Sequence, residues 1–196
     1  MSSKTAAAII GYNFKMPDLS SLYSKNMLNL TLDRLVGTDP GPKNHPHQAT
    51  WVNLVRLADK SLREYEAARN AFAVLQKEIH QGHISPLFLG IDHLENAITA
   101  THRAVLHSEV LRAAGWGRAV RTPTTRQKAL LKAMRHHVEH AEDKLHKGQI
   151  AQGQPFMITP KERRMSFGKT TLTYLDLARC ITKVYRHIEA IRGPSL

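Results

Sequence analysis

Cysteine and aromatic side chains are scarce in this chain of 196 residues, of which only 6% are aromatic. With a single cysteine, Cys180, the protein can form neither an internal disulfide nor a zinc site built from cysteines. Leu and Ala dominate over β-branched and aromatic residues, which favours helix over sheet. These scarcities exclude a disulfide-stapled scaffold and predict an all-α fold.

Long apolar runs are also missing from the sequence. No stretch of about 18 consecutive apolar residues exists, so we expect no membrane-spanning helix. The N-terminal sequence MSSKTAAAIIGYNFK contains an apolar run of only five residues, which is too short for the hydrophobic region of a signal peptide. The sequence therefore predicts a cytoplasmic protein that does not use a membrane.

Acidic residues are too few to balance the basic ones. The chain has 16 Asp and Glu against 28 Lys and Arg, which gives a net charge of +12 and a pI of about 10.1. A charge of this size predicts attraction to polyanions such as RNA, DNA or an anionic membrane. A basic protein without any role in nucleic-acid binding is the alternative that composition leaves open.

One part of the chain concentrates this imbalance, because no acidic residue stands between Arg112 and Met134. The stretch crosses a loop and enters a helix, where cationic side chains and helix N–H groups can neutralise phosphates. Trp116 could stack on an exposed base, or it could pack against the protein itself. The residues predicted to bind nucleic acid, most suitably RNA, are Arg112, Trp116, Arg118, Arg121, Arg126, Lys128 and Lys132.

Apolar residues recur with three- and four-residue steps in four long segments, which predicts amphipathic helices. His93, His102 and His107 fall on the second segment and are expected at its surface or boundary. The last segment has the most regular pattern, formed by Tyr174, Leu177, Ile181, Val184, Ile188 and Ile191. The four helices are expected at about 48–80, 86–113, 125–147 and 171–192.

Two regions fall outside these four helices. A shorter helix is expected over 18–36, followed by a Pro-rich loop at 37–47. Residues 149–170 contain FMIT and RMSF on either side of PKER, which predicts a small β-hairpin or ordered loop. We therefore predict an antiparallel four-helix bundle over 46–196, with a short insert before its last helix, and an N-terminal arm, helix and loop over 1–45.

The third predicted helix carries the sequence RHHVEHAEDKLH, from Arg135 to His146, which is rich in both histidine and carboxylate. Its predicted buried stripe is Leu130, Met134, Val138, Ala141 and Leu145. His136 and His140 point away from this stripe, and Glu139 can pair with Arg135 one turn earlier. The simplest interpretation is therefore a solvated polar face.

A metal site is a second interpretation of the same residues. His136 to His140 spell H-x-x-E-H, the inverzincin pattern, in which two histidines hold zinc and the glutamate acts as base. That fold needs a further glutamate ligand well downstream, and neither Glu162 nor Glu189 has a matching context. We therefore predict no metal or other cofactor.

Cleavage of RNA without metal is a third interpretation. Attack by a 2′-hydroxyl requires a base, an acid and a cation for the phosphate. Histidine suits the proton transfers near neutral pH, and arginine provides a permanent, fork-shaped charge. Arg135, followed after four residues by His140, provides both groups.

This spacing resembles the R-x4–6-H motif of the HEPN superfamily, all-helical domains that include metal-independent ribonucleases of toxin–antitoxin and phage-defence systems. The residue after the arginine is often polar in the family, and here it is His136. The order of two long helices, a motif helix, a short insert and a final helix with LTYLDLARCI also resembles uncharacterised HEPN-like bacterial proteins, over roughly 48–192.

The resemblance implies a role for each residue of the motif. Arg135 would stabilise the phosphate and His140 would act as general acid or base, with His136 assisting by hydrogen bonding and with His137 and Glu139 in support. Because Arg135 and His140 are about 140° apart on an ideal helix, a homodimer with paired motifs is expected. An antitoxin is a possible partner, and a non-catalytic module that binds nucleic acid or protein is the alternative.

Overall fold

The computed structural model describes residues 13–22, 41–43, 46–149 and 157–192, and in this part the chain is predominantly helical. The structure also contains a small sheet beside the helices. The prediction of an all-α protein is therefore correct in its helices but missed this sheet. The described elements are η1 (Ser20–Leu22), α3 (His47–Glu78), η2 (Ile79–Gln81), α4 (Ser85–Ala113), α5 (Thr125–His146), β1 (Thr159–Pro160), β2 (Arg164–Phe167), β3 (Thr170–Thr173) and α6 (Tyr174–Arg192).

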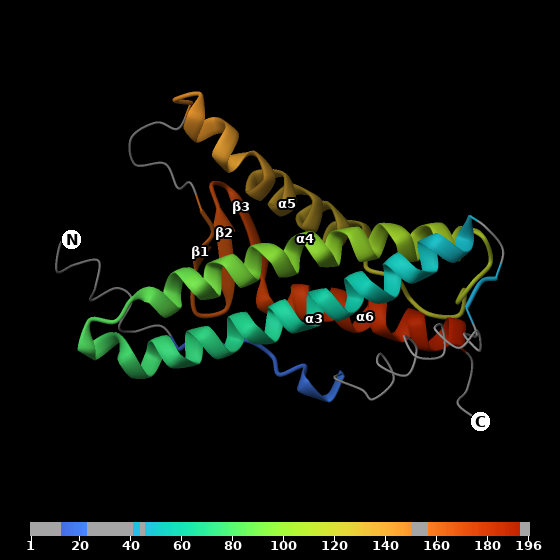
Figure 1. The fold of residues 1–196 in the computed structure, drawn as a ribbon, viewed down its shortest axis with the longest axis horizontal. Coiled ribbons are helices and arrows are strands. Elements are labelled where there is room, and N and C mark those ends of the chain that lie inside the picture. Colours follow the sequence, from blue (N-terminus) through green and yellow to red (C-terminus); the bar gives the residue numbers. More distant parts are fainter. Residues whose placement is uncertain (1–12, 23–40, 44–45, 150–156, 193–196) are drawn as a thin grey trace.

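Helices α3 and α4 form a long antiparallel hairpin, and α6 lies alongside them (Figure 1). The hairpin turns at Gly82, whose φ of 79° is a left-handed conformation that glycine adopts without steric cost. Close packing within the hairpin requires a second glycine, since a Cβ at Gly90 would lie 2.5 Å from the ring of Phe72. On both helices the buried residues recur with three- and four-residue steps, in agreement with the predicted periodicity.

Helix α6 completes the core of the helical body. All six residues of its predicted stripe are buried: Tyr174, Leu177, Ile181, Val184, Ile188 and Ile191. Cys180 is also completely buried, and burial raises the pKa of its thiol to about 12. Because the reactive form of cysteine is the thiolate, this side chain acts as a small packing residue.

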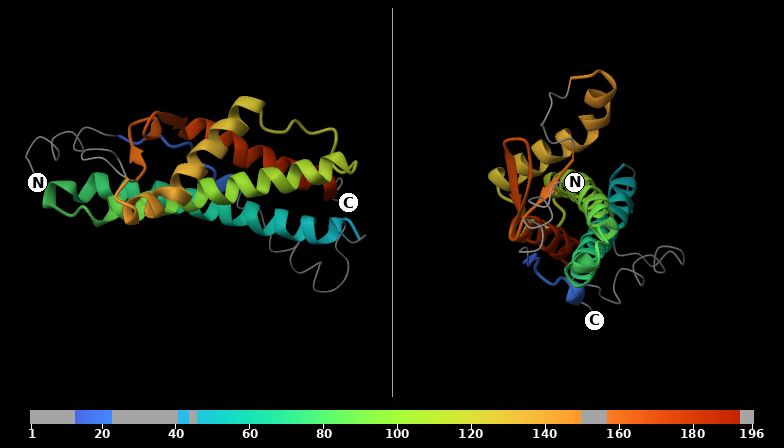
Figure 2. Two further views of the ribbon diagram at one scale, coloured as in Figure 1. Left: turned by 90° about the horizontal axis from the view of Figure 1, so that it is seen from above. Right: turned by 90° about the vertical axis from the view of Figure 1, so that its left-hand side faces the viewer.

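Helix α5 starts at a capping box, in which the Thr124 hydroxyl accepts from the Gln127 N–H and the Gln127 side chain accepts from the Thr124 N–H. From there α5 crosses α4, and its C-terminal half extends away from the other helices (Figure 2). Only Met134 and Ala141 of the predicted buried stripe are buried, and Val138 is half-buried. Leu131 is buried where Leu130 is only half-buried, and Leu145 is 48% exposed because α5 has passed beyond the core.

The segment before α6 forms a three-stranded antiparallel sheet in the order β1-β2-β3. The predicted hairpin is present, with Thr159 opposite Ser166, but a third strand follows it. Residues 170–173 belong to β3, so the last helix begins at Tyr174 rather than at about Thr171. Thr173 fixes this start, because its Oγ1 accepts from the Asp176 N–H at 2.9 Å.

The described N-terminal residues lie against the helical body. Phe14 stacks on Phe72 with ring centroids 4.5 Å apart. The Pro17 carbonyl accepts from the Tyr65 hydroxyl, and the buried carboxylate of Glu66 accepts from the Leu19 N–H at 2.8 Å. Of the helix expected over 18–36, only 18–22 is described, and Ser20–Leu22 is a single 3-10 turn; the rest lies outside the described residues.

Candidate functional site

The side chains of the RHHVEH sequence leave α5 in three directions. Arg135 and Glu139 lie on the side facing α4, where they meet His102. His137 lies on the opposite side and contacts β2 and β3. His136 and His140 are exposed between these two sides. The polar residues of this sequence therefore fall into three groups. Arg135 and Glu139 pair with each other beside α4, His137 contacts the sheet, and His136 and His140 are exposed.

Arg135 is held at both ends of its guanidinium group. Its Nε donates to Glu139 Oε1 at 2.7 Å, which confirms the i,i+4 pair expected from the sequence. Its Nη1 lies 3.4 Å from His102 Nδ1 on α4. The side chain of Arg135 is still 31% exposed, so part of the guanidinium can meet a ligand from solvent.

His102 is the residue of this cluster that sequence reasoning missed. It was expected at the surface or boundary, but it is buried, with 7% of its surface exposed. Its position four residues after Ile98 and three before Val105 places it beside the apolar stripe of α4, and this spacing was the available signal. A guanidinium only donates hydrogen bonds, so Nδ1 of His102 is the acceptor.

Burial lowers the pKa of His102, and the positive charge of Arg135 lowers it further. His102 is therefore neutral at physiological pH and can keep accepting from Arg135. Glu139, in contrast to His102, carries a charge. Its hydrogen bond with Arg135 lowers its pKa and keeps the carboxylate ionised. Arg135 is thus fixed between a neutral acceptor on one helix and an anionic acceptor on the other.

His136 and His140 form a pair on the open side of α5. Their ring centroids lie 4.4 Å apart with an interplanar angle of 60°, and both residues are exposed. Both point away from the buried stripe, as predicted. His140 is about 140° around the helix from Arg135, since it lies five positions further along the chain. One chain therefore does not direct Arg135 and His140 at the same point.

His137 is engaged with the sheet. Its Nε2 lies 3.1 Å from Thr170 Oγ1, and its ring stacks on Phe167 with centroids 5.1 Å apart and an interplanar angle of 6°. Burial lowers its pKa, and the nearby charges of Lys144 and His136 act in the same direction. These contacts fix α5 to the sheet, so His137 supports the position of its neighbours.

Among the described residues, no group of three or more His, Cys, Asp and Glu side chains is arranged to hold a metal ion. His136 and His140 would offer two nitrogens at most. Asp143, one turn further along, is paired with Lys147 at 2.7 Å. A zinc site of the kind suggested by H-x-x-E-H requires at least one more protein ligand than this face provides.

Three residues of the predicted nucleic-acid surface make contacts within the protein. Arg112 donates to the Val120 carbonyl and Lys128 pairs with Glu109. Trp116 packs against the core, and its carbonyl accepts from His187 Nε2 at 3.1 Å. These three side chains shape the loop and the start of α5, and the indole of Trp116 is only partly available for stacking.

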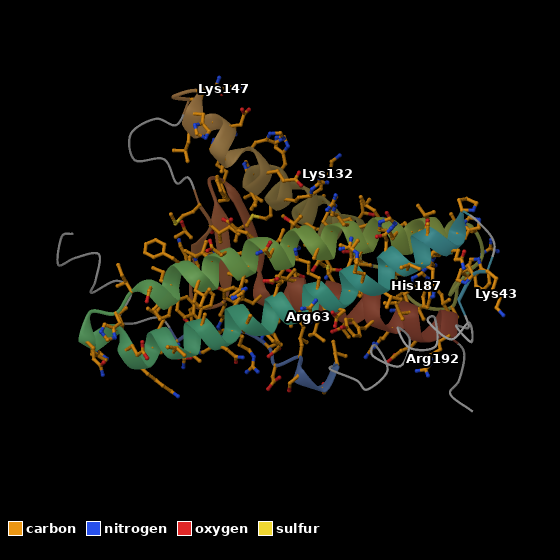
Figure 3. The ribbon with its side chains drawn as sticks, viewed as in Figure 1. Lys43, Arg63, Lys132, Lys147, His187 and Arg192 are labelled. Atoms are coloured by element: carbon orange, nitrogen blue, oxygen red, sulfur yellow. The ribbon has the colours of Figure 1, made fainter. Side chains whose placement is uncertain are left out.

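The other four residues of that surface are more open. Arg118, Arg121, Arg126 and Lys132 are exposed, and within the described part of the chain none of them forms a salt bridge. Figure 3 marks Lys132 on α5, and Lys147 at the projecting end of the same helix. The loop after α4 and the first half of α5 therefore carry positive charge that no salt bridge among the described residues neutralises at these four positions.

No protein-family model, curated protein or solved structure matches this chain. The resemblance to HEPN domains therefore rests on the residues of the chain itself. Within its described parts, no helix combines the length and the apolar character needed to cross a membrane.

Proposed function

We propose that this protein is a metal-independent endoribonuclease of the HEPN type, built on an antiparallel four-helix bundle and acting in the cytoplasm as a toxin or phage-defence effector. The observation that supports this proposal most directly is the exposed pair of His136 and His140, one turn from an arginine held in place by two acceptors. These residue types are the ones that phosphodiester cleavage without metal requires.

In the proposed reaction, His140 accepts the proton of a ribose 2′-hydroxyl, whose oxygen attacks the adjacent phosphorus. The bond from phosphorus to the 5′-oxygen breaks, and a protonated histidine, His136 or its symmetry-related counterpart, returns a proton to that oxygen. Arg135 stabilises the negative charge that develops on the phosphate. Glu139 and His102 hold the guanidinium in position while part of it remains exposed.

The reaction needs two copies of the chain in this proposal. Arg135 and His140 point in different directions from one α5, so a two-fold axis beside this helix would bring Arg135 of one copy towards His140 of the other. An antitoxin protein would then act by covering this face or by separating the two copies.

A non-catalytic module that binds RNA is the second candidate, and one observation favours it. The guanidinium of Arg135 already forms a charge-assisted hydrogen bond with Glu139, and this carboxylate would repel a phosphate. Affinity would then come mainly from the open cations Arg118, Arg121, Arg126 and Lys132.

The test is incubation of the purified chain with total RNA in EDTA, with wild type beside His140→Ala and Arg135→Ala. Both substitutions are expected to abolish cleavage. His146→Ala is the matched control, since His146 is exposed on the same helix but lies outside the motif. Cleavage that survives both substitutions refutes the proposed site, and intact RNA in every lane, together with salt-sensitive binding, supports the second candidate.

A further inference from the structure

Basic side chains also gather on a part of the surface that the RHHVEH sequence does not reach. Arg103 and His107 stand one turn apart on α4, and Arg56 lies on α3. Arg56 and Arg103 are exposed, and His107 is half-buried. We name these three residues the α3–α4 basic strip.

The antiparallel register of α3 and α4 brings the three residues together. Glu64 on α3 contacts His93 on α4 at 2.7 Å, which fixes the register of the two helices. Eight residues back along α3, about 12 Å at the α-helical rise, is Arg56. The same distance forward along α4 reaches Thr101, and Arg103 and His107 follow about 3 Å and about 9 Å further along the helix. The strip therefore includes residues from both helices.

Electrostatic effects show the same proximity. Burial lowers the pKa of His107, and the positive charges of Arg103 and Arg56 lower it further. Arg103 also lowers the pKa of Glu139 on α5. Arg103 is therefore close enough to affect α5 as well as its own helix, and positive charge continues from Arg135 across α4 to α3.

The two arginines of the strip are not neutralised by a salt bridge in the part of the chain that the structure describes. Within the described residues, neither Arg56 nor Arg103 forms a salt bridge, and the one hydrogen bond of the Arg56 side chain goes to the neutral amide of Asn53 at 3.4 Å. By contrast, Arg63 on α3 and Arg135 on α5 each form a salt bridge with a carboxylate of their own helix. Glu139 on α5 attracts Arg103, but its carboxylate is already hydrogen-bonded to Arg135. Arg56 and Arg103 both lie near His107, and an anionic ligand would reduce the repulsion between these positive charges.

Apolar side chains accompany the strip. Leu106 and Val110 on α4 are 47% and 50% exposed, and their helical positions place them on the same outward face as Arg103. Single-stranded RNA combines charged phosphates with apolar base faces, so it suits a surface on which cations and exposed aliphatic side chains alternate.

We propose that the α3–α4 basic strip binds the phosphates of a single-stranded RNA segment adjoining the one held at Arg135, with Leu106 and Val110 contacting its bases. The proposal rests on the proposed function in taking RNA as the ligand, but it does not depend on cleavage. Its consequence is that longer RNAs bind more tightly than short ones, because only they reach from α5 to α3.

The experiment measures equilibrium binding of full-length chains carrying His140→Ala, which keeps the RNA intact. Unstructured RNAs of about 4 and about 16 nucleotides bracket the site sizes of known single-strand binders. Adding Arg56→Gln with Arg103→Gln is expected to make the plot of log Kd against log salt concentration for the longer RNA less steep. The slope should fall by about 1.4, since each lost phosphate contact removes about 0.7 from it. The affinity for the short RNA should change much less.

The matched control is Arg179→Gln with Arg186→Gln, which removes the same charge from two exposed positions of α6. This variant should bind the longer RNA like the parent chain. If both double variants lose affinity for the longer RNA equally, net charge alone explains the binding and the strip is refuted. The strip is refuted as well if the strip variant loses no affinity. Circular dichroism of all variants checks that the helices are intact.

The two proposals fail in different ways in these measurements. If the wild type leaves RNA uncut but the strip variant still loses affinity selectively, the ribonuclease is refuted and the strip stands. If RNA is cut in a His140-dependent way but the strip variant binds like the parent, the strip is refuted and the ribonuclease stands. A parent chain that binds neither RNA refutes the strip, and the ribonuclease is then decided by the cleavage assay alone.

Discussion

Nη1 of Arg135 lies 3.4 Å from Nδ1 of His102, across the contact between α5 and α4. The two residues are 33 positions apart in the chain, and only the packing of the two helices brings them together. His102 is buried and neutral, whereas Glu139, the other acceptor of Arg135, is exposed and ionised. The orientation of the proposed phosphate-binding residue therefore depends on a second helix.

Replacing His102 by leucine removes an acceptor from Arg135 while keeping an apolar side chain of similar size in the core. We expect His102→Leu to reduce RNA cleavage roughly tenfold to a hundredfold, as displacement of a positioned group by about 1 Å does. His102→Asn, which retains an acceptor, should restore part of the activity. Single-turnover cleavage measures the effect, and thermal unfolding monitors stability. Equal activity of the leucine and asparagine variants would refute a positioning role.

Removing the charge of Glu139 should strengthen binding of polyanions. Glu139→Gln abolishes the negative partner of Arg135, so we expect RNA affinity to rise a few-fold at low salt, with the gain declining as salt screens the charges. Asp143→Asn is the control, because Asp143 is also paired within α5, with Lys147, but lies one turn beyond Glu139. Fluorescence anisotropy with labelled RNA compares them, and an equal gain for both would mean that the effect is not specific to Arg135.

Two glycines with the same backbone conformation allow a clean comparison of packing. Gly117 and Gly148 have φ of 60° and 62°, but a Cβ at Gly117 would lie 2.5 Å from His187, whereas one at Gly148 would meet nothing within 4 Å. Gly148→Ala should cost only the backbone term of about 1 kcal/mol. Gly117→Ala should destabilise by at least about 1 kcal/mol more, because His187 must move. Urea unfolding measures both, and equal values would contradict this packing.

His187 should make stability depend on pH. It is buried between the Ser108 hydroxyl, 2.6 Å from its Nδ1, and the Trp116 carbonyl, and burial lowers its pKa, with the charge of Arg112 acting in the same direction. Since the unfolded chain then takes up its proton at a higher pH, near 6.5, than the folded chain does, stability should fall as pH drops below about 6.5.

The measurement for His187 is the thermal midpoint between about pH 7.5 and 5.5, a range that spans the ordinary histidine pKa. His187→Gln should be less stable than wild type at the upper pH but should lose less on acidification. His146→Gln, at an exposed position, should behave like wild type. An unchanged slope in His187→Gln would assign the pH dependence to other histidines, of which His102, His107 and His137 also have lowered pKa values.

Periodicity predicted the helices well because each helix buries one stripe, and a stripe is a local property of the sequence. The stripe of α6 is buried at every predicted position, and α3, α4 and α5 begin and end within about three residues of the predicted bounds. The third strand was missed because Thr170 to Thr173 look like a helix start until they pair with β2.

The sequence by itself determined which residues form helices, where the basic stretch lies, and that Arg135, Glu139, His136 and His140 share one helix, because helical spacing depends only on position along the chain. Tertiary structure decided which of them meet other elements: Arg135 reaches His102, and His137 is engaged by the sheet. It also brings Arg56 on α3 close enough to His107 on α4 to lower the pKa of that histidine. The crossing of α5 over α4 and the register of α3 with α4 set these contacts. Both are fixed by the packing of side chains far apart in sequence, which no local pattern records.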